Sequence, residues 1–226
     1  MSVALLADAH IGGPGGPAEP LIAQLAALPA RGCTRLVLLG DLFQVWVGAR
    51  RYETPDIRAV VAALEALAAG GVRLDYIEGN RDFFLAGSPY ASLFASVGSE
   101  LAFAVNGRRY LAVHGDGLNE RDRQYLFWRW LSKSAPSRFA MRRLPRALAG
   151  WSVQRAEREL AKTNFKHKAR VPEEAILSYA RRRLAEGHDE LVLGHFHEER
   201  RWRLPEGTVW LLDAWFHSRR IEWLPT

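Results

Sequence analysis

The stretch Leu36-Val37-Leu38-Leu39-Gly40-Asp41 decides the fold of this chain. Its four consecutive apolar residues predict a strand that is buried on both faces, as in the middle of a layered sheet. Gly40 allows a sharp turn without a Cβ clash, and Asp41 follows at the carboxyl end of the strand, where open α/β sheets place their ligands. The stretch therefore predicts a buried sheet with a carboxylate at its functional edge.

The same arrangement occurs four more times along the chain. Each further apolar strand ends in residues that can bind metal ions: Asp8-Ala9-His10, Gly79-Asn80-Arg81-Asp82, His114-Gly115-Asp116 and Gly194-His195-Phe196-His197. A single Asp or His at a strand end is more often a turn residue or a core residue than a ligand. Five such strand ends in order are hard to obtain by chance, so we predict one metal centre built from them.

The candidate ligands are three oxygen donors and four imidazoles: Asp8, Asp41, Asn80, His10, His114, His195 and His197. This set is too large for one tetrahedral zinc ion and suits two five- or six-coordinate ions that share Asp41. The mixture of carboxylate, amide and imidazole favours Mn²⁺ or a similar divalent ion. Two such ions generate hydroxide at neutral pH and bind a phosphoryl oxygen, and Arg81 supplies a guanidinium suited to phosphate. Asp82 and Asp116 are expected either to orient ligands or to cap turns.

Periodicity and breakers place the remaining elements. They predict helices at 18–28, 55–69, 89–97 and from Pro172 onward. The first helix and its flanking strands should form a right-handed βαβ unit with parallel strands. Asn106-Gly107 between two apolar runs predicts a hairpin. The runs 199–204, 208–212 and 219–223 are expected to close the sheet as a meander.

Charge is unevenly distributed along the chain, whose formal net charge is +6. Residues 121–170 hold 14 Lys or Arg against three acidic residues, a net charge of +11, which leaves −5 for the rest. The same segment mixes aromatic and basic residues at helical spacing, and Pro136 and Pro145 divide it. We interpret residues 119–170 as an inserted helical cap that faces an anionic partner, and residues 1–118 with 171–226 as the core.

Bulk features predict a cytoplasmic location. No apolar run approaches the roughly 20 residues that span a bilayer. No secretory signal is recognised at the start of the chain, and a single cysteine, Cys33, fits a reducing compartment.

The motifs quoted above resemble the calcineurin-like metallophosphoesterase pattern over nearly the whole chain. The resemblance implies an α/β fold, a four-layer α/β-β/β sandwich into which the helical cap is inserted. It also implies how the ligands divide. One metal would be held by Asp8, His10, Asp41 and His197, and the other by Asp41, Asn80, His114 and His195.

A narrower resemblance is to the UDP-2,3-diacylglucosamine pyrophosphatases of lipid A biosynthesis. It is carried by residues 40–48, 79–85 and 114–118 and by the spacing Asp122-x-x-Tyr125. Arg81 directly after Asn80 is typical of that branch, whereas Ala49-Arg50 and Phe196 depart from its usual pattern. The resemblance implies three catalytic residues, Asn80, Arg81 and His195. The same three would bind the substrate together with Asp122, Asn164 and Lys168.

The function that this resemblance implies is hydrolysis of UDP-2,3-diacylglucosamine. Hydroxide attack on the α-phosphorus would give UMP and 2,3-diacylglucosamine 1-phosphate. The cap would hold the lipid and rest on the anionic inner face of the inner membrane, as in a peripheral protein.

Two other functions are compatible with parts of this pattern. A metal-dependent nuclease or nucleotide phosphodiesterase would use the basic block to bind nucleic acid. The aromatic residues of the cap are mixed with leucines at helical spacing, which favours lipid, so no nucleic acid is expected. A non-catalytic interaction scaffold would be expected to lose ligands, and none is missing.

Overall fold

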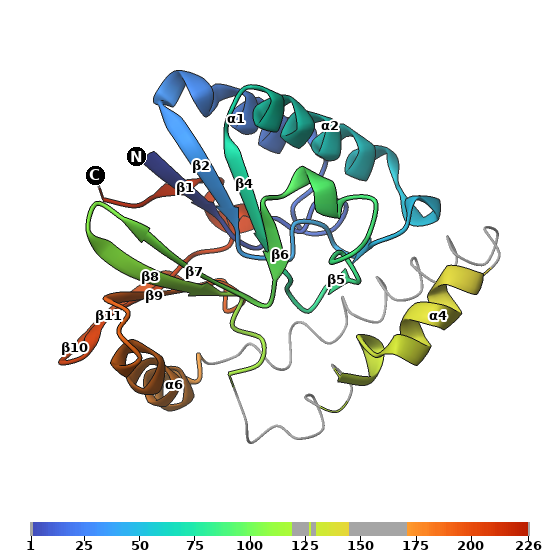
Figure 1. Ribbon diagram of the computed structural model, residues 1–226. Helices are drawn as coiled ribbons and strands as arrows, with labels where there is room; N and C mark the ends of the chain where they lie inside the picture. Colours follow the sequence, from blue (N-terminus) through green and yellow to red (C-terminus); the bar gives the residue numbers. More distant parts are fainter. Residues whose placement is uncertain (1, 119–126, 128–129, 145–170, 226) are drawn as a thin grey trace.

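Two five-stranded sheets form the centre of the computed structural model, which describes residues 2–118, 127, 130–144 and 171–225 (Figure 1). The strands of the first sheet are β1 (Ser2–Leu6), β2 (Cys33–Leu38), β4 (Arg73–Ile77), β6 (Ser96–Gly98) and β12 (Glu222–Trp223). Those of the second are β7 (Glu100–Val105), β8 (Arg108–Val113), β9 (Glu190–Leu193), β10 (Arg200–Leu204) and β11 (Gly207–Leu211). The spatial orders are β12-β1-β2-β4-β6 and β10-β11-β9-β8-β7.

Helices and short elements complete the described chain. The α-helices are α1 (Glu19–Ala27), α2 (Pro55–Ala69), α4 (Ala135–Arg143), α6 (Glu173–Ala185) and α7 (Trp215–Ser218). The 3-10 helices are η1 (Pro29–Arg31), η2 (Arg50–Tyr52) and η3 (Ala91–Leu93). Strands β3 (Trp46–Val47) and β5 (Asp82–Phe83) form a separate parallel pair.

The side chains of β2 show how the layers are built. Leu36 and Leu38 belong to the apolar cluster shared with α1 and α2, which cover the outer face of the first sheet. Val37 and the following Leu39 point the other way, into the cluster between the sheets. This alternation is what a strand buried on both faces requires. The expectation drawn from the stretch 36–41 is therefore confirmed.

The remaining two layers follow from the second sheet. Its inner face contributes Tyr110, Val192 and Trp210 to the cluster between the sheets. Its outer face packs against Ile176 and Leu184 of α6. The order helices, sheet, sheet, helix is the predicted four-layer α/β-β/β sandwich.

Parallel strands carry the functional edge. Strands β1, β2, β4 and β6 run parallel, as do β8, β9 and β11, so the carboxyl ends within each set lie at the same edge of its sheet. The predicted parallel pairing of the strands on either side of α1 and the helix at 55–69 are confirmed. Thr54 caps that helix by accepting the N–H of Ile57 at 3.2 Å. The hairpin of β7 and β8 turns at Asn106 and Gly107, both with positive φ.

Two expected elements differ from the structure. Residues 89–97 form only part of the expected helix: Ala91–Leu93 make the 3-10 helix η3, and Ser96–Gly98 then add a parallel strand beside β4. The Ser96 hydroxyl donates to the buried Asp75 carboxylate at 2.7 Å, which favours this edge position. The three C-terminal runs do not form the expected meander: β10 and β11 pair antiparallel, but β11 lies between β10 and β9, and the last run leaves this sheet. After α7, strand β12 pairs antiparallel with β1 in the first sheet, with Ala4 opposite Trp223.

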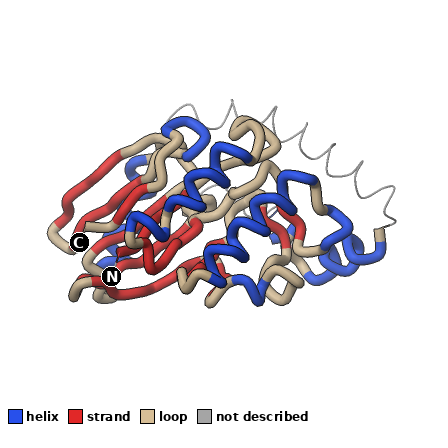
Figure 2. The backbone as a smooth tube through the Cα atoms, turned by 90° about the horizontal axis from the view of Figure 1, so that it is seen from above, coloured by secondary structure: helices blue, strands red, loops and turns tan. Residues whose placement is uncertain are grey.

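The pairing of β12 with β1 brings the two ends of the described chain to the same end of the sandwich (Figure 2). Within the described ranges, no helix combines the length and the apolar character needed to cross a membrane.

Candidate metal centre

All seven predicted ligands meet at one edge of the sandwich. Each follows the carboxyl end of a strand: Asp8 and His10 after β1, Asp41 after β2, Asn80 after β4, His114 after β8, and His195 and His197 after β9. Asp8, His10, Asp41 and His114 are buried, whereas Asn80, His195 and His197 are half-buried. Among the candidate ligands, the last three are therefore those that solvent reaches.

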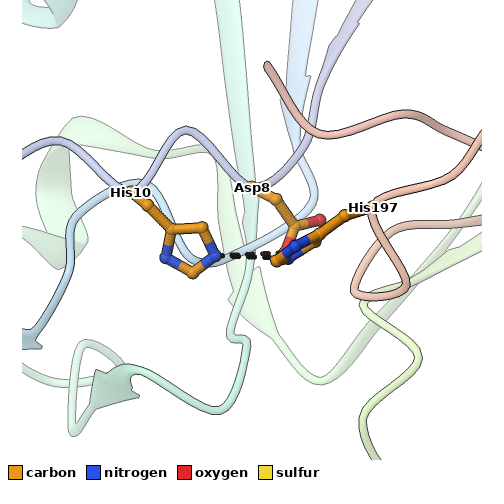
Figure 3. Close-up of side chains that lie close together, drawn as sticks. All are labelled: Asp8, His10 and His197. Carbon is orange, nitrogen blue, oxygen red and sulfur yellow. Dashed lines mark hydrogen bonds and ion pairs between the residues drawn. The ribbon is translucent and has the colours of Figure 1, made fainter. Parts of the chain in front are cut away.

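The first group consists of Asp8, His10 and His197, whose side chains point toward one another (Figure 3). The Nε2 atoms of the two histidines are 3.3 Å apart. Asp8 Oδ1 lies 3.1 Å from Nε2 of His197 and 3.7 Å from Nε2 of His10. Two imidazole nitrogens and a carboxylate oxygen thus converge, and all three can donate a lone pair to a metal ion.

The second group is centred on His114. Its Nδ1 lies 2.6 Å from the carbonyl oxygen of Leu39, which can only accept, so Nδ1 carries a proton. Its Nε2 faces three potential ligand atoms, at 3.3 Å for Asn80 Oδ1, 3.3 Å for His195 Nδ1 and 3.6 Å for Asp41 Oδ2. With the neutral imidazole, a lone pair on Nε2 points toward these atoms, so the three side chains around it can hold a cation together with His114. A backbone acceptor on the far ring nitrogen is the usual support of a metal-binding histidine.

Asp41 joins the two groups. Its Oδ2 lies 3.8 Å from His10 Nε2 and 3.6 Å from His114 Nε2, so one oxygen faces both. Asp8, Asp41 and His114 also form a group of their own that could hold an ion. The donor set and its convergence fit two divalent ions with a shared carboxylate.

The backbone at the site is unusual. Five ligands have a positive φ: Asp8 (50°), His10 (46°), Asp41 (53°), His195 (72°) and His197 (57°). Residues other than glycine rarely adopt this left-handed conformation, and such strain concentrates at functional sites. Here it turns the chain directly after a strand, which lets two ligands that are two residues apart converge on one point.

Two glycines give the ligands room. Gly40 has φ +85°, and a Cβ there would lie 2.6 Å from the backbone nitrogen of Gly79. A Cβ on Gly79 would lie 2.3 Å from Asp41 Oδ1. The loops after β2 and β4 therefore approach each other more closely than any larger residue permits.

The charges of the site favour a bound cation. Burial would raise the pKa of Asp8, but the nearby histidines, His197 first, hold it well below its usual range. Burial would lower the pKa of His114, but the carboxylates of Asp41 and Asp8 raise it. Asp8 is thus an ionised carboxylate in a buried environment, where it attracts positive charge strongly.

Two neighbours hold Asp41 in place. Arg81 is 1% exposed, donates its backbone N–H to Asp41 Oδ1 at 2.9 Å and places Nε 3.8 Å from Oδ2. Asp82 accepts the backbone N–H groups of Asp41 at 2.9 Å and of Gly79 at 2.8 Å. Burial and the Asp41 charge raise the pKa of Asp82 to about 7. Asp82 thus ties two ligand loops together, one of the two roles expected for it.

Two residues beside the centre had no signal in the sequence. Lys133 Nζ donates to the carbonyl oxygen of Gly79 at 2.7 Å, but it is one of many cations in its segment. The Phe216 ring packs edge-on against His10 and His197, with centroids 5.5 and 4.9 Å apart. The predicted substrate-binding residues Asp122, Asn164 and Lys168 lie outside the described residues.

Comparison with known proteins identifies similar sequences. No family model matches the chain. It is 31% identical over 196 residues to UDP-2,3-diacylglucosamine hydrolase of Ralstonia nicotianae, an alignment that covers 82% of this chain and 73% of that protein. It is 36% identical over 117 residues to the hydrolase of the same name in Stutzerimonas stutzeri, covering 50% of this chain and 47% of that protein. It is 34% identical over 137 residues to the hydrolase of the same name in Xanthomonas oryzae pv. oryzae, an alignment that covers 57% of this chain and 52% of that protein.

Solved structures show more distant likenesses. An archaeal phosphodiesterase matches 99% of both chains at 9% identity and a TM-score of 0.49. Vps29 of Chaetomium thermophilum matches at 10% identity and a TM-score of 0.48, covering 95% of this chain and 71% of that one. Both scores are below 0.5, so the fold assignment rests on the layers described above.

Proposed function

The chain belongs to the UDP-2,3-diacylglucosamine hydrolase family, and from this premise we propose that it hydrolyses the pyrophosphate bond of UDP-2,3-diacylglucosamine. The products would be UMP and 2,3-diacylglucosamine 1-phosphate. The observation that carries the proposal is the convergence of two groups of carboxylate and imidazole ligands on Asp41. The family relationship supports the choice of substrate.

The proposed division of ligands follows the two groups. Asp8, His10, Asp41 and His197 would hold one divalent ion, and Asp41, Asn80, His114 and His195 the other. When bound, the two ions, which we propose to be Mn²⁺, supply Lewis acidity and make water acidic enough to react at neutral pH. Arg81 lies beside the shared carboxylate, so its charge would stabilise negative charge on the reacting phosphoryl group.

Substrate would bind on the exposed side of the centre. Asn80 and His195 are half-buried there, so their side chains can contact the diphosphate as well as a metal ion. We propose that Asp122, Asn164 and Lys168 complete the binding of the sugar nucleotide from the insertion of residues 119–170.

We also propose that this insertion rests on an anionic membrane surface. Three large apolar side chains are more than half exposed among the described residues, and all belong to the insertion: Phe127 (53%), Trp130 (66%) and Phe139 (61%). Arg143 lies over the ring of Phe139, at 4.8 Å from its centroid. Exposed aromatic rings beside arginines suit the interface of an anionic bilayer.

The substrate is tested by comparing UDP-2,3-diacylglucosamine with UDP-glucosamine in one preparation of the full chain with Mn²⁺. We expect efficient hydrolysis of the first and poor hydrolysis of the second, because each buried CH₂ contributes about 0.8 kcal/mol to binding. Comparable rates on both substrates, or faster cleavage of single-stranded DNA, would contradict the proposal.

Membrane binding is tested separately by sedimentation with vesicles. We expect binding to vesicles rich in phosphatidylglycerol and weak binding to phosphatidylcholine alone. A variant with both Trp130→Ser and Phe139→Ser should bind these vesicles less than the parent does. The control Trp223→Ser changes a residue on β12, at the far edge of the first sheet, and should bind them as the parent does. Equal binding by the two variants would remove the support for this surface.

A further inference from the structure

Helix α4, in the described part of the insertion, lies beside the core (Figure 1) and contacts the loop that carries η2. At the end of α4, the Met141 carbonyl accepts the Tyr52 hydroxyl and the Leu144 carbonyl accepts Arg51 Nη1, both at 2.8 Å. The Met141 side chain packs against the cluster of Val45, Val47 and Tyr52. Because these contacts satisfy carbonyl groups at a helix end, they fix the position of α4 on the core.

Lys133 extends this docking to the centre itself. It lies in the turn before α4, one residue ahead of the N-cap Ser134. The Ser134 side chain accepts the N–H of Ser137 at 3.4 Å, and the Ser137 hydroxyl donates to the Leu131 carbonyl at 2.7 Å. These bonds hold the turn, and from it the half-buried Lys133 side chain reaches the Gly79 carbonyl at 2.7 Å.

The contact falls directly before a ligand. The Gly79 carbonyl belongs to the peptide group that joins Gly79 to Asn80. The N–H of Gly79, in the preceding peptide group, donates to Asp82 at 2.8 Å. The two peptide groups that flank Gly79 are therefore held by two side chains, one from the core and one from the insertion. Both contacts restrain the backbone directly before Asn80, whose Oδ1 lies 3.3 Å from His114 Nε2.

We propose that Lys133 is a positioning residue for the metal centre, through which the docked insertion sets the Asn80 ligand. Complete metal binding then depends on a residue of the insertion as well as on the core. The inference deepens the proposed function, since it assigns a positioning role at the same site. It requires only that Asn80 binds a metal ion, not that the substrate is a lipid.

The test compares Lys133→Met and Lys133→Arg in the full chain. Mn²⁺ binding is measured by titration of metal-free protein without substrate, and kcat and KM are measured on bis(p-nitrophenyl) phosphate. We expect Lys133→Met to weaken binding of one of the two Mn²⁺ ions and to lower kcat, each by about 10- to 100-fold, with little change in KM. Lys133→Arg keeps a cationic donor and should restore most of both losses.

Two matched variants separate this role from general docking. Arg138→Met removes a cation from the same segment, where its guanidinium lies over Phe84, 5.3 Å from the ring centroid. Tyr52→Phe removes one hydrogen bond at the other end of α4. Both should leave Mn²⁺ affinity within about 2-fold of the parent, because neither touches the peptide before Asn80.

Unchanged Mn²⁺ affinity in Lys133→Met, in protein with the circular dichroism spectrum of the parent, would overturn the inference. So would an equal loss in Arg138→Met or Tyr52→Phe. If Lys133→Met does not fold, the comparison of Lys133→Arg with Lys133→Gln decides, with the same expected ordering. A normal Mn²⁺ result with no hydrolysis of UDP-2,3-diacylglucosamine by the parent would contradict the proposed function and leave this inference standing.

Discussion

At the scale of single residues, the centre combines strain with buried charge. Five of its seven candidate ligands occupy left-handed backbone conformations, each costing about 1–2 kcal/mol for a residue other than glycine. Asp41 lies where the two ligand groups meet. Neither the strained backbone nor the shared carboxylate is needed to form the sandwich, so both are features of the site rather than of the fold.

Asp41→Ala tests the shared ligand. We expect the variant to lose metal and activity together, because both groups lose the same oxygen, while the chain remains folded. Elemental analysis of metal per chain and circular dichroism measure the two results. Two metal ions retained per chain would show that Asp41 is not shared.

His197→Gly and His197→Ala form a matched pair for the backbone strain. Both lose the imidazole, so both should lose activity. The glycine variant should be more stable than the alanine variant by about 1 kcal/mol, because only glycine adopts φ 57° without strain. Urea denaturation of metal-free protein measures the difference, and an alanine variant of equal or greater stability would contradict it.

At the scale of elements, most of the sheet edge could be predicted. The four apolar residues before Asp41 indicated a buried strand, and the pattern of 55–69 indicated the helix that is observed. Strand β12 could not be predicted as a member of the first sheet, because its partner lies more than 200 residues away in sequence. The left-handed conformations of the ligands and the contact of Lys133 with Gly79 could not be predicted either, since both depend on contacts between loops that are distant in sequence.

Asp75 tests how the first sheet is held together. It is fully buried and accepts hydrogen bonds from Arg35 at 2.8 Å and from Arg73 at 3.0 Å, and it also accepts the Ser96 hydroxyl, which links β2, β4 and β6. Burial would raise its pKa, but these partners, Arg73 first, lower it. Asp75→Asn should destabilise the protein at neutral pH by about 3–5 kcal/mol, because Arg35 stays buried without its counter-charge.

The same residue gives a pH dependence. A carboxylate whose folded pKa is lowered stabilises the protein above its ordinary pKa, and this contribution is lost as the pH falls through the folded pKa. The gap in unfolding free energy between parent and Asp75→Asn should therefore shrink below about pH 4. Glu186→Gln, which breaks an exposed pair with Arg183, should change stability by less than about 1 kcal/mol at either pH. A gap that stays constant with pH would rule out the ionised pair.

At the scale of the whole molecule, charge is divided between the insertion and the core. Residues 121–170 carry a net charge of +11 within a chain of +6. The described part of the insertion also holds the exposed aromatic residues. The described part of the insertion, which borders the candidate metal centre through Lys133, thus combines exposed aromatic rings with basic residues.

Salt should therefore weaken vesicle binding while it leaves hydrolysis of a small soluble substrate nearly unchanged. Raising NaCl from about 0.05 M to about 0.5 M shortens the Debye length several-fold and should release the protein from phosphatidylglycerol vesicles. Hydrolysis of bis(p-nitrophenyl) phosphate, a small soluble substrate, should change little over the same range. If salt lowered vesicle binding and hydrolysis equally, it would be acting at the metal centre rather than on the insertion.

The distance along the chain between Asp8 and His197 has a consequence for biosynthesis. These two side chains touch although 189 residues separate them, so the first ligand group is incomplete until the ribosome has made nearly the whole described chain. Until then β1 also lacks its neighbour β12, and one edge of the first sheet is unpaired. We therefore expect metal loading to come late in the maturation of this protein, and a nascent chain arrested before residue 190 should not retain an ion that needs His197.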